Sequence, residues 1–354
     1  MNVGVPKEIK VEEYRVGLIP EFTKYLVKKG HKVIVQKDAG IGAGFSDEEY
    51  ILSGAEIVEK IEDVYERCEL IVKVKEPQEK ELTFVREGQV LFTFFHFSSN
   101  REMTEKLIEK KATCIAYELI EEKGILPILR PMSEIAGKLS IQEGMKYLEK
   151  EYGGKGILLS GAEGVRSGNV VIIGGGTVGY NAGVIAEGIG ASIIFLEIDE
   201  KKGNLLKKRF KKADVLYSNR QNLKKALKKA DVVIGAVLIP GRRTPVIIKE
   251  DDLKLMEKGS IIVDVSIDEG GICETSKPTT HKEPIFICND ILHYCVPNIP
   301  GVVPKTSTLA LNYASFPYLK EIVKGEKNWS KNRVIEKGLA IYKGNLKREF
   351  SYNS

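Results

Sequence analysis

The stretch VVIIGGGTVGYNAGVIAEGIGASIIFLE, residues 170–197, decides the fold. It contains an apolar strand, a glycine-rich loop, a helix rich in small residues, and a second apolar strand that ends in Glu197. Gly174–Gly179 fits the pattern G-x-G-x-x-G. The pattern alone is a weak signal, but a strand directly before it and a helix directly after it are the context of a dinucleotide-binding loop. We therefore predict that this segment binds a dinucleotide.

Each glycine of this loop has a physical reason. Gly174 permits the tight turn, Gly176 lets the backbone approach the pyrophosphate, and Gly179 lets helix and strand pack closely. The phosphates are then expected on the unpaired N–H groups at the helix N-terminus, where the helix dipole favours negative charge. The alternative is a purely structural glycine turn.

Glu197 lies about 20 residues beyond the loop, where an acid would bind both ribose hydroxyls. An acid at this position repels a 2′-phosphate, so the sequence favours NAD over NADP. Lys201 and Lys202 follow closely and weaken that preference.

Strand and helix patterns alternate on both sides of a connecting segment. The strands we expect are Val3–Val5, Lys32–Gln36, Leu70–Val74, Val90–Phe95 and Cys114–Tyr117, then Val170–Ile173, Ser192–Leu196, Val232–Ala236, Ser260–Val265 and Ile285–Cys288. Ser133–Tyr152 is predicted to be a long connecting helix, and the tail is predicted to be helical over Leu309–Val323 and Asn332–Tyr342. This alternation predicts the α/β class, with largely parallel sheets covered by helices on both faces.

We expect two doubly wound, Rossmann-like domains with a cleft between them. Residues 1–128 and 303–354 would form a discontinuous substrate domain, and residues 129–302 would form the NAD-binding domain. The length of 354 residues suits two domains.

Composition excludes several classes of function. The 54 basic and 49 acidic residues indicate a mixed charged surface and no nucleic-acid stripe. The basic run Lys207–Lys212 is interpreted as a solvated helix face. No apolar run approaches the ~20 residues that cross a bilayer, and no secretory signal is present, so we expect a cytoplasmic protein. The five scattered cysteines indicate reduced thiols, and neither they nor His281 and His293 suggest a metal site.

Four charged or titratable residues stand where ligands bind in α/β folds. Lys75, His96 and Asp268 follow strand ends, and Arg15 lies in the loop after the first strand. Ligands bind outside the carboxyl ends of the strands in open α/β sheets. Each residue also has an ordinary explanation: a solvated strand end, a core histidine, a turn residue and a surface arginine. Their shared placement favours a functional cluster.

The loop Cys295–Gly301, punctuated by prolines, comes where the nicotinamide should lie. Asn298 in this loop could donate a hydrogen bond to the carboxamide, or it could be an ordinary turn residue.

Family-specific segments accompany these features from residue 1 to about residue 325. The chain resembles the alanine dehydrogenase family, which shares ancestry with the NAD-binding part of proton-translocating transhydrogenase. The resemblance rests on GVPKE (4–8), EYRV (13–16), GFSD (44–47), VKVKEP (72–77), PMSEIAG (131–137), the glycine loop, IGAVLIPG (234–241), DVSIDEGG (264–271) and PKTST (304–308).

The resemblance implies reversible oxidative deamination of L-alanine to pyruvate and ammonia with NAD, by a homohexamer. It implies that Arg15 and Lys75 bind the substrate, that His96 handles protons and that Asp268 assists the amine chemistry. The cofactor-binding residues that we expect are Ser133, Gly174, Gly176, Thr177, Val178, Gly179, Glu197, Lys202, Ser218, Val237, Leu238, Ile267, Asp268 and Asn298.

The sequence departs from the family pattern at a few positions and leaves other functions open. Glu197 replaces a usual aspartate, FHFSS (95–99) replaces a usual LHLAA, Arg130 replaces a small residue and Pro297 replaces an alanine. The alternatives are a dehydrogenase for another small amino acid or 2-oxo acid, a soluble NAD(H)-binding component of a transhydrogenase, and a non-catalytic NAD-binding protein.

Overall fold

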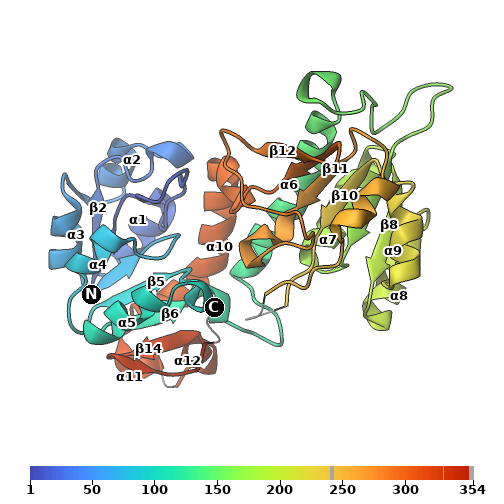
Figure 1. Cartoon of the computed structure of the whole chain (residues 1–354). Helices are drawn as coiled ribbons and strands as arrows, with labels where there is room; N and C mark the ends of the chain where they lie inside the picture. Colours follow the sequence, from blue (N-terminus) through green and yellow to red (C-terminus); the bar gives the residue numbers. More distant parts are fainter. Residues whose placement is uncertain (240–242, 330, 351–354) are drawn as a thin grey trace. The chain divides into compact units, whose positions relative to one another are not determined.

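A computed structural model describes residues 1–239, 243–329 and 331–350. The chain divides into two compact units, Met1–Met132 with Gly301–Ser354, and Ser133–Pro300. Each unit is built around one sheet (Figure 1). The division after Met132 falls within helix α6 (Leu129–Tyr147). Pro240 and Gly241, the last two residues of the IGAVLIPG segment, lie outside the described residues.

Unit 1 contains an eight-stranded sheet in the order β15-β14-β6-β5-β4-β1-β2-β3. The parallel part of this sheet consists of β1 (Asn2–Val5), β2 (Lys32–Gln36), β3 (Glu56–Val58), β4 (Leu70–Val72), β5 (Val90–Thr93) and β6 (Thr113–Ala116). Every residue of β4, β5 and β6 is buried. Such continuous apolar strands are typical of a parallel sheet covered on both faces.

Short helices connect these strands. They are α1 (Pro20–Lys28), α2 (Asp47–Leu52), α3 (Ile61–Arg67), α4 (Glu79–Phe84) and α5 (Arg101–Glu109). Ser46 caps α2 in a capping box with Glu49. The long helix α10 (Pro304–Ile322) returns to this unit and carries Thr308 and Asn312, both buried.

The end of the chain corrects one expectation. Asn332–Tyr342 was predicted to be a single helix, but α12 (Arg333–Gly338) ends at a glycine and Leu339–Tyr342 forms strand β14. β14 pairs antiparallel with β6, and β15 (Asn345–Leu346) pairs with β14. The apolar run Leu339–Ile341 is buried on this edge, so tertiary pairing overrides the local helical pattern. The sheet is therefore mixed, although mostly parallel.

Unit 2 contains a seven-stranded sheet in the order β12-β13-β11-β10-β7-β8-β9. Its strands are β7 (Asn169–Ile173), β8 (Ser192–Glu197), β9 (Asp214–Tyr217), β10 (Val232–Gly235), β11 (Ile261–Asp264), β12 (Ile285–Cys288) and β13 (Ile291–Tyr294). In this second sheet, among the described pairings, only β12 and β13 pair antiparallel. Helices α7 (Thr177–Gly188), α8 (Glu200–Arg209) and α9 (Arg220–Leu227) follow β7, β8 and β9. The two mostly parallel α/β sheets confirm the predicted fold class.

The strand order reverses around β7, because β8 and β10 pair with its two sides. The glycine loop follows β7 and therefore lies at the topological switch point, where α/β sheets bind ligands. The predicted helix Ser133–Tyr152 is correct in its centre. It runs from Leu129 to Tyr147, and Lys150–Tyr152 forms a separate 3-10 turn.

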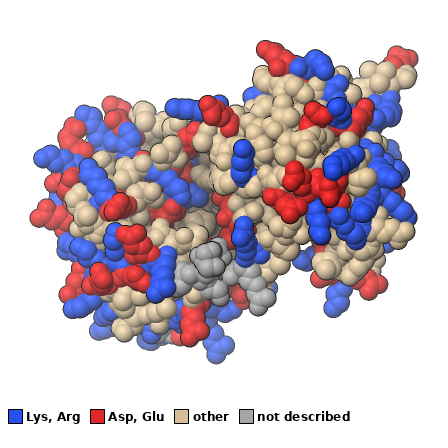
Figure 2. Space-filling view, viewed as in Figure 1, with Lys and Arg blue, Asp and Glu red and all other residues tan. Residues whose placement is uncertain are grey.

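The distribution of charged side chains and the state of the cysteines match what the composition predicts. Basic and acidic side chains are interspersed over the visible face (Figure 2). At the end of α8 the lysines of the basic run are exposed while Phe210 is buried. All five cysteines are free thiols. Among residues 1–239, 243–329 and 331–350, no helix combines the length and apolarity that crossing a membrane requires.

A pair of glycine substitutions in α7 tests the packing at the switch point. A Cβ on Gly179 would lie 1.9 Å from the Gly174 carbonyl oxygen, whereas a Cβ on Gly188 would meet nothing within 4 Å. We expect Gly179→Ala to lower the free energy of unfolding by about 1–3 kcal/mol, as overpacking does. Gly188→Ala should leave it unchanged or raise it by up to about 1 kcal/mol. Urea denaturation measures both, and equal effects would contradict this account.

Candidate active site

The first group of predicted site residues lies at the carboxyl edge of the sheet in unit 1. Lys75 follows β4 and His96 follows β5, and the two strands are neighbours. The ladder continues past the strand ends, because Phe94 N donates to Val74 O at 3.3 Å and Thr93 Oγ1 donates to Lys75 O at 2.8 Å. Lys75 is 7% exposed. It is therefore not the solvated strand end of the alternative interpretation.

Arg15 lies in the loop between β1 and α1 and is only 2% exposed, so the alternative of a surface arginine is wrong. Its Nε donates to Glu13 Oε1 at 2.7 Å and its Nη2 donates to Glu13 Oε2 at 2.5 Å. Its Nη1 lies 3.2 Å from the sulfur of Met132. One edge of the guanidinium is thus held by Glu13, and the edge that carries Nη1 contacts a thioether, a weak acceptor.

Helix α10 holds the backbone of this loop. Thr308 Oγ1 accepts from Val16 N at 3.3 Å, and Asn312 both accepts from Ile19 N at 2.9 Å and donates to Val16 O at 3.0 Å. These side chains satisfy backbone groups that the loop itself leaves unpaired. Because the contacts span nearly 300 residues of sequence, local patterns gave no signal for them.

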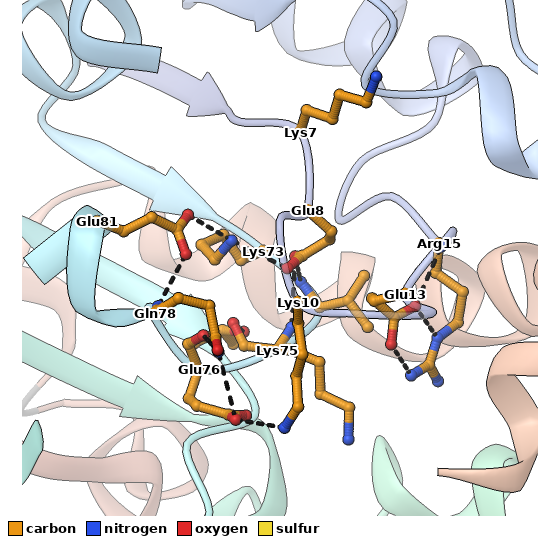
Figure 3. A network of polar contacts seen from close by, with 12 residues as sticks. Lys7, Glu8, Lys10, Glu13, Arg15, Lys73, Lys75, Glu76, Gln78 and Glu81 are labelled. Atoms are coloured by element: carbon orange, nitrogen blue, oxygen red, sulfur yellow. Dashed lines mark hydrogen bonds and ion pairs between the residues drawn. The ribbon is translucent and has the colours of Figure 1, made fainter. Parts of the chain in front are cut away.

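A buried charge network surrounds Lys73, two residues before Lys75 in the sequence (Figure 3). Lys73 Nζ is 2.9 Å from Glu8 Oε2 and 2.7 Å from Glu81 Oε1, and all three side chains are at least 98% buried. At its edge Lys10 Nζ pairs with Glu76 at 2.5 Å. Sequence reasoning assigned these residues no role. A lysine inside the apolar stretch that follows β4 was the available signal.

His96 has an unusual backbone for a non-glycine residue, with φ 52° and ψ 46°. The Glu118 carboxylate accepts from His96 N at 2.8 Å and from Phe95 N at 3.1 Å, and these bonds hold the backbone in this conformation. The left-handed conformation is uncommon and costs free energy that surrounding contacts must offset. Burial raises the pKa of Glu118 to about 7 against those backbone hydrogen bonds.

Electrostatics show that the three predicted residues act on one another. Burial, then the charge of Lys75, lowers the pKa of His96 to about 3, and Lys10 and Arg15 add to the effect while Glu76 opposes it. Burial opposes ionisation of Glu13, but Arg15 and Lys75 outweigh it and lower its pKa to about 2. Arg15, Lys75 and His96 therefore form one cluster with an imidazole that is neutral at pH 7.

The second group lies at the carboxyl edge of the sheet in unit 2, beginning with the glycine loop. Gly174 has φ 98° and a Cβ there would lie 2.5 Å from the Ala236 carbonyl oxygen, so only glycine fits the turn. Gly176 is the N-cap of α7 and no side chain caps this helix. A Cβ on Gly176 would meet nothing within 4 Å, so its surroundings are open. The N–H groups of Thr177 and Val178 open the helix, which suits a phosphate.

Glu197 ends β8 and is 7% exposed. Its Oε2 accepts from Gly175 N at 2.6 Å, and its Oε1 accepts from Ile198 N and Asp199 N at 2.8 Å each. Ser218 follows β9, and its N–H donates to the Glu197 carbonyl at 3.0 Å. A cavity of about 530 Å³ opens beside Gly175 and is lined by Lys202 and Leu206. Glu197, Lys202 and Ser218 thus surround the ribose end of the predicted site.

The other side of the switch point carries the residues expected near the nicotinamide. Val237 N donates to Ser266 Oγ at 3.0 Å, which joins the Val237–Leu238 backbone to the turn that carries Ile267 and Asp268. Asn298 N lies 3.3 and 3.4 Å from the two Asp268 carboxylate oxygens, and Asn298 has φ 57°. Ser133 is half-buried on α6. Leu238 and Asp268 are exposed, and Ile267 is buried.

The turn itself depends on a residue that sequence reasoning passed over. Asp264, 1% exposed, accepts from Ser266 N at 3.1 Å, Ile272 N at 2.8 Å and Ser276 Oγ at 2.6 Å. That the two groups of residues meet across a cleft stays a prediction, as do the individual roles of the residues. Among the described residues no cluster of three or more His, Cys, Asp or Glu side chains could hold a metal ion.

The lowered pKa of His96 predicts a pH dependence of stability. Between about pH 6.5 and pH 3 the unfolded imidazole binds a proton that the folded one does not. The unfolded state then holds more protons, so the free energy of unfolding falls as the pH falls through this range. We expect His96→Gln to make that fall shallower in urea titrations at several pH values. His31→Gln removes a half-buried histidine outside this network; burial lowers its pKa as well, but less than that of His96, so its effect on the slope should be the smaller one. An unchanged slope in His96→Gln would contradict the assignment.

Comparison with known proteins matches two family models in succession along the sequence; the first ends close to the first boundary between the structural units, and the second continues into the C-terminal part of unit 1. Residues 4–136 match the model described as "Alanine dehydrogenase/PNT, N-terminal domain", and residues 140–349 match "Alanine dehydrogenase/PNT, C-terminal domain". An alanine dehydrogenase of Staphylococcus haemolyticus is 45% identical over 98% of this chain and 94% of its own length. One of Methanococcus maripaludis is 46% identical over 99% of this chain and 95% of its own length.

The comparison with solved structures finds the same family. A structure titled L-alanine dehydrogenase has a TM-score of 0.94 at 43% identity and covers 98% of this chain and 97% of its own. A transhydrogenase from Sinorhizobium meliloti has a TM-score of 0.84 at 19% identity, with 98% and 100% covered, and shows the fold alone. Full-length matches well above 30% identity leave no ambiguity: the chain belongs to the alanine dehydrogenase/PNT family.

Proposed function

We propose that this protein is an alanine dehydrogenase, which catalyses the NAD-dependent, reversible oxidative deamination of L-alanine to pyruvate and ammonia. The observation that carries the proposal is the cluster of buried Arg15, buried Lys75 and half-buried His96 in a chain 42–46% identical over nearly its full length to alanine dehydrogenases. To bind and oxidise a small amino acid, a site requires one cation for the carboxylate, a second cation beside it and a neutral base.

Each residue of the cluster has a proposed task. Arg15, with one edge fixed by Glu13, presents Nη1 to the substrate carboxylate. Lys75 stabilises the oxygen that becomes negative as water adds to the substrate carbon. His96 is neutral at pH 7, so it can accept the proton that this water loses and return it in the reverse direction. Asp268 supports the amine chemistry.

The residues of unit 2 fit a dinucleotide. The uncapped N-terminus of α7 and the open space at Gly176 would receive the pyrophosphate, and Glu197 would hold the ribose hydroxyls. NAD supplies the hydride acceptor for C2 of the amino acid. Overall, L-alanine, NAD⁺ and water give pyruvate, ammonium, NADH and a proton. The expected homohexamer stays a prediction.

Activity assays on three proteins test the proposal. The wild-type chain should reduce NAD with L-alanine and oxidise NADH with pyruvate and ammonium. Lys75→Ala and His96→Ala should each abolish turnover, because the reacting oxygen and its proton lose their partners, while NADH still binds. NADH absorbance measures turnover, and fluorescence measures NADH binding.

A panel of small amino acids assayed beside L-alanine separates this proposal from the alternative of a dehydrogenase that acts on another small amino acid. A clear preference for another substrate would contradict alanine as the substrate. Activity retained in either variant would contradict the assignment of Lys75 or His96.

Cofactor choice provides a separate prediction. We expect kcat/KM for NAD to exceed that for NADP by at least about hundredfold, because the buried Glu197 carboxylate would meet a 2′-phosphate with like charge. Glu197→Gln removes the charge at the same length and should shrink the ratio at least about tenfold. Glu163→Gln removes an exposed acid from the segment before β7, away from the carboxyl edge of the sheet, and should leave the ratio unchanged. A wild-type ratio near one would contradict the role of Glu197.

A further inference from the structure

Glu8 is a buried acid in the loop after β1 to which the proposed reaction gives no task. Its Oε2 accepts from Lys73 Nζ at 2.9 Å. Its Oε1 accepts from the backbone N–H of Val74 at 2.7 Å and of Lys75 at 3.3 Å. One carboxylate thus contacts a buried ammonium and the main chain of the residue proposed to bind substrate.

The surrounding backbone leaves little room for this edge to shift. Gly17, in the same loop as Glu8 and Arg15, packs directly on the end of β4, where a Cβ would lie 2.7 Å from Val72 O and 2.9 Å from Lys73 N. The loop and the strand end therefore touch at Gly17 and are bonded at Glu8. A displacement of Lys75 would have to break the contacts of Glu8.

The charge of Lys73 does not by itself require Glu8. Glu81 Oε1 lies 2.7 Å from the same ammonium, also buried. Glu81 differs in its other contacts, because its Oε2 accepts from Gln78 N at 2.8 Å and its Oε1 accepts from Tyr65 Oη at 3.2 Å. The two acids share Lys73, but the hydrogen bond to the Lys75 N–H group is made by Glu8 and the contacts of Glu81 are to Gln78 and Tyr65.

We propose that Glu8 is a positioning residue for Lys75: by accepting the N–H groups of Val74 and Lys75 it fixes the end of β4 against the loop that carries Arg15 (Figure 3). The proposal rests on the proposed function in so far as Lys75 binds the substrate. It assigns the effect to the position of an acceptor oxygen and not to a negative charge.

This assignment predicts an unusual order for two conservative variants. Glu8→Gln loses the charge but keeps a carbonyl oxygen at the same reach, which can still accept from the Val74 and Lys75 N–H groups. Its NH2 group replaces the oxygen that accepts from Lys73 Nζ, so the lysine then pairs with Glu81 alone. Glu8→Asp keeps the charge but withdraws the acceptor by one methylene. Glu8→Asp should therefore be the impaired variant, although charge alone would make it the milder one.

The assay compares these variants with Glu81→Gln and Glu81→Asp, which disturb the same lysine. We expect Glu8→Asp to lower kcat/KM for L-alanine about ten- to hundredfold, as misplacement of a reacting group by about 1 Å does. Glu8→Gln and both Glu81 variants should stay within about threefold of wild type. The Kd for NADH should be unchanged in all four. A lower melting temperature in any of them does not bear on the result.

Three results of this assay overturn the inference. Either Glu8→Gln is as impaired as Glu8→Asp, which makes charge the cause, or Glu81→Asp is as impaired as Glu8→Asp, which makes general damage to the network the cause. A Glu8→Asp protein with wild-type kcat/KM also refutes it.

Hydrogen exchange provides a readout that does not depend on the reaction. In mass spectrometry of a peptide covering Leu70–Pro77, Glu8→Asp should speed exchange at the Val74 and Lys75 amides, and Glu8→Gln should not. A wild-type protein inactive with L-alanine would refute the proposed function while the exchange rates still test Glu8. Equal exchange in wild type and Glu8→Asp would refute the positioning role.

Discussion

Burying a charged side chain costs several kcal/mol unless an opposite charge and hydrogen bonds compensate it, and the carboxyl edge of the first sheet is built around that requirement. Arg15 can be 2% exposed because Glu13 takes two of its N–H donors. Lys73 can be 1% exposed because it lies between Glu8 and Glu81. These ion pairs connect the β1–α1 loop, the end of β4 and helix α4, so the compensation of charge also determines how three separate segments pack.

The same charges divide the titratable groups of this edge into two kinds. Lys75 and Arg15 lower the pKa of both Glu13 and His96, which leaves the first an anion and the second a neutral imidazole. Glu118, which bonds to backbone N–H groups and has no cation among its main influences, has its pKa raised by burial to about 7. Environments that separate the pKa values of neighbouring groups are how a fold assigns acid and base roles. The two acids differ because cations face Glu13 and not Glu118, whereas burial is the largest cause of the lowered pKa of His96 and the charge of Lys75 the second.

Local patterns in the sequence were sufficient for the fold class and the strand-end residues, because both depend on short stretches of chain. The glycine loop, Lys75 and His96 follow apolar runs whose length and composition predict strands. The partners of these residues could not be found in this way. Glu13 was visible as a neighbour of Arg15, but only packing shows that it holds the guanidinium, and Asn312 reaches the Arg15 loop from α10. The short strand β14 could not be predicted for a similar reason, because it forms only through its pairing with β6.

In this protein, acidic side chains at the carboxyl ends of strands mostly accept hydrogen bonds from backbone N–H groups. Where a strand ends and the chain turns, N–H groups lose their ladder partners and need other acceptors. At four strand-end turns a carboxylate accepts such N–H groups: the acceptors are buried Glu8, Glu197 and Asp264 and half-buried Glu118. An acid at this edge is therefore weak evidence for catalysis until its partners are known. Asp268 differs from these four, because it is exposed and its carboxylate lies 3.3 and 3.4 Å from Asn298 N, at the long end of hydrogen bonding. A carboxylate held so loosely by the backbone keeps lone pairs for a ligand, which supports the proposal that Asp268, and not Asp264, assists the amine chemistry.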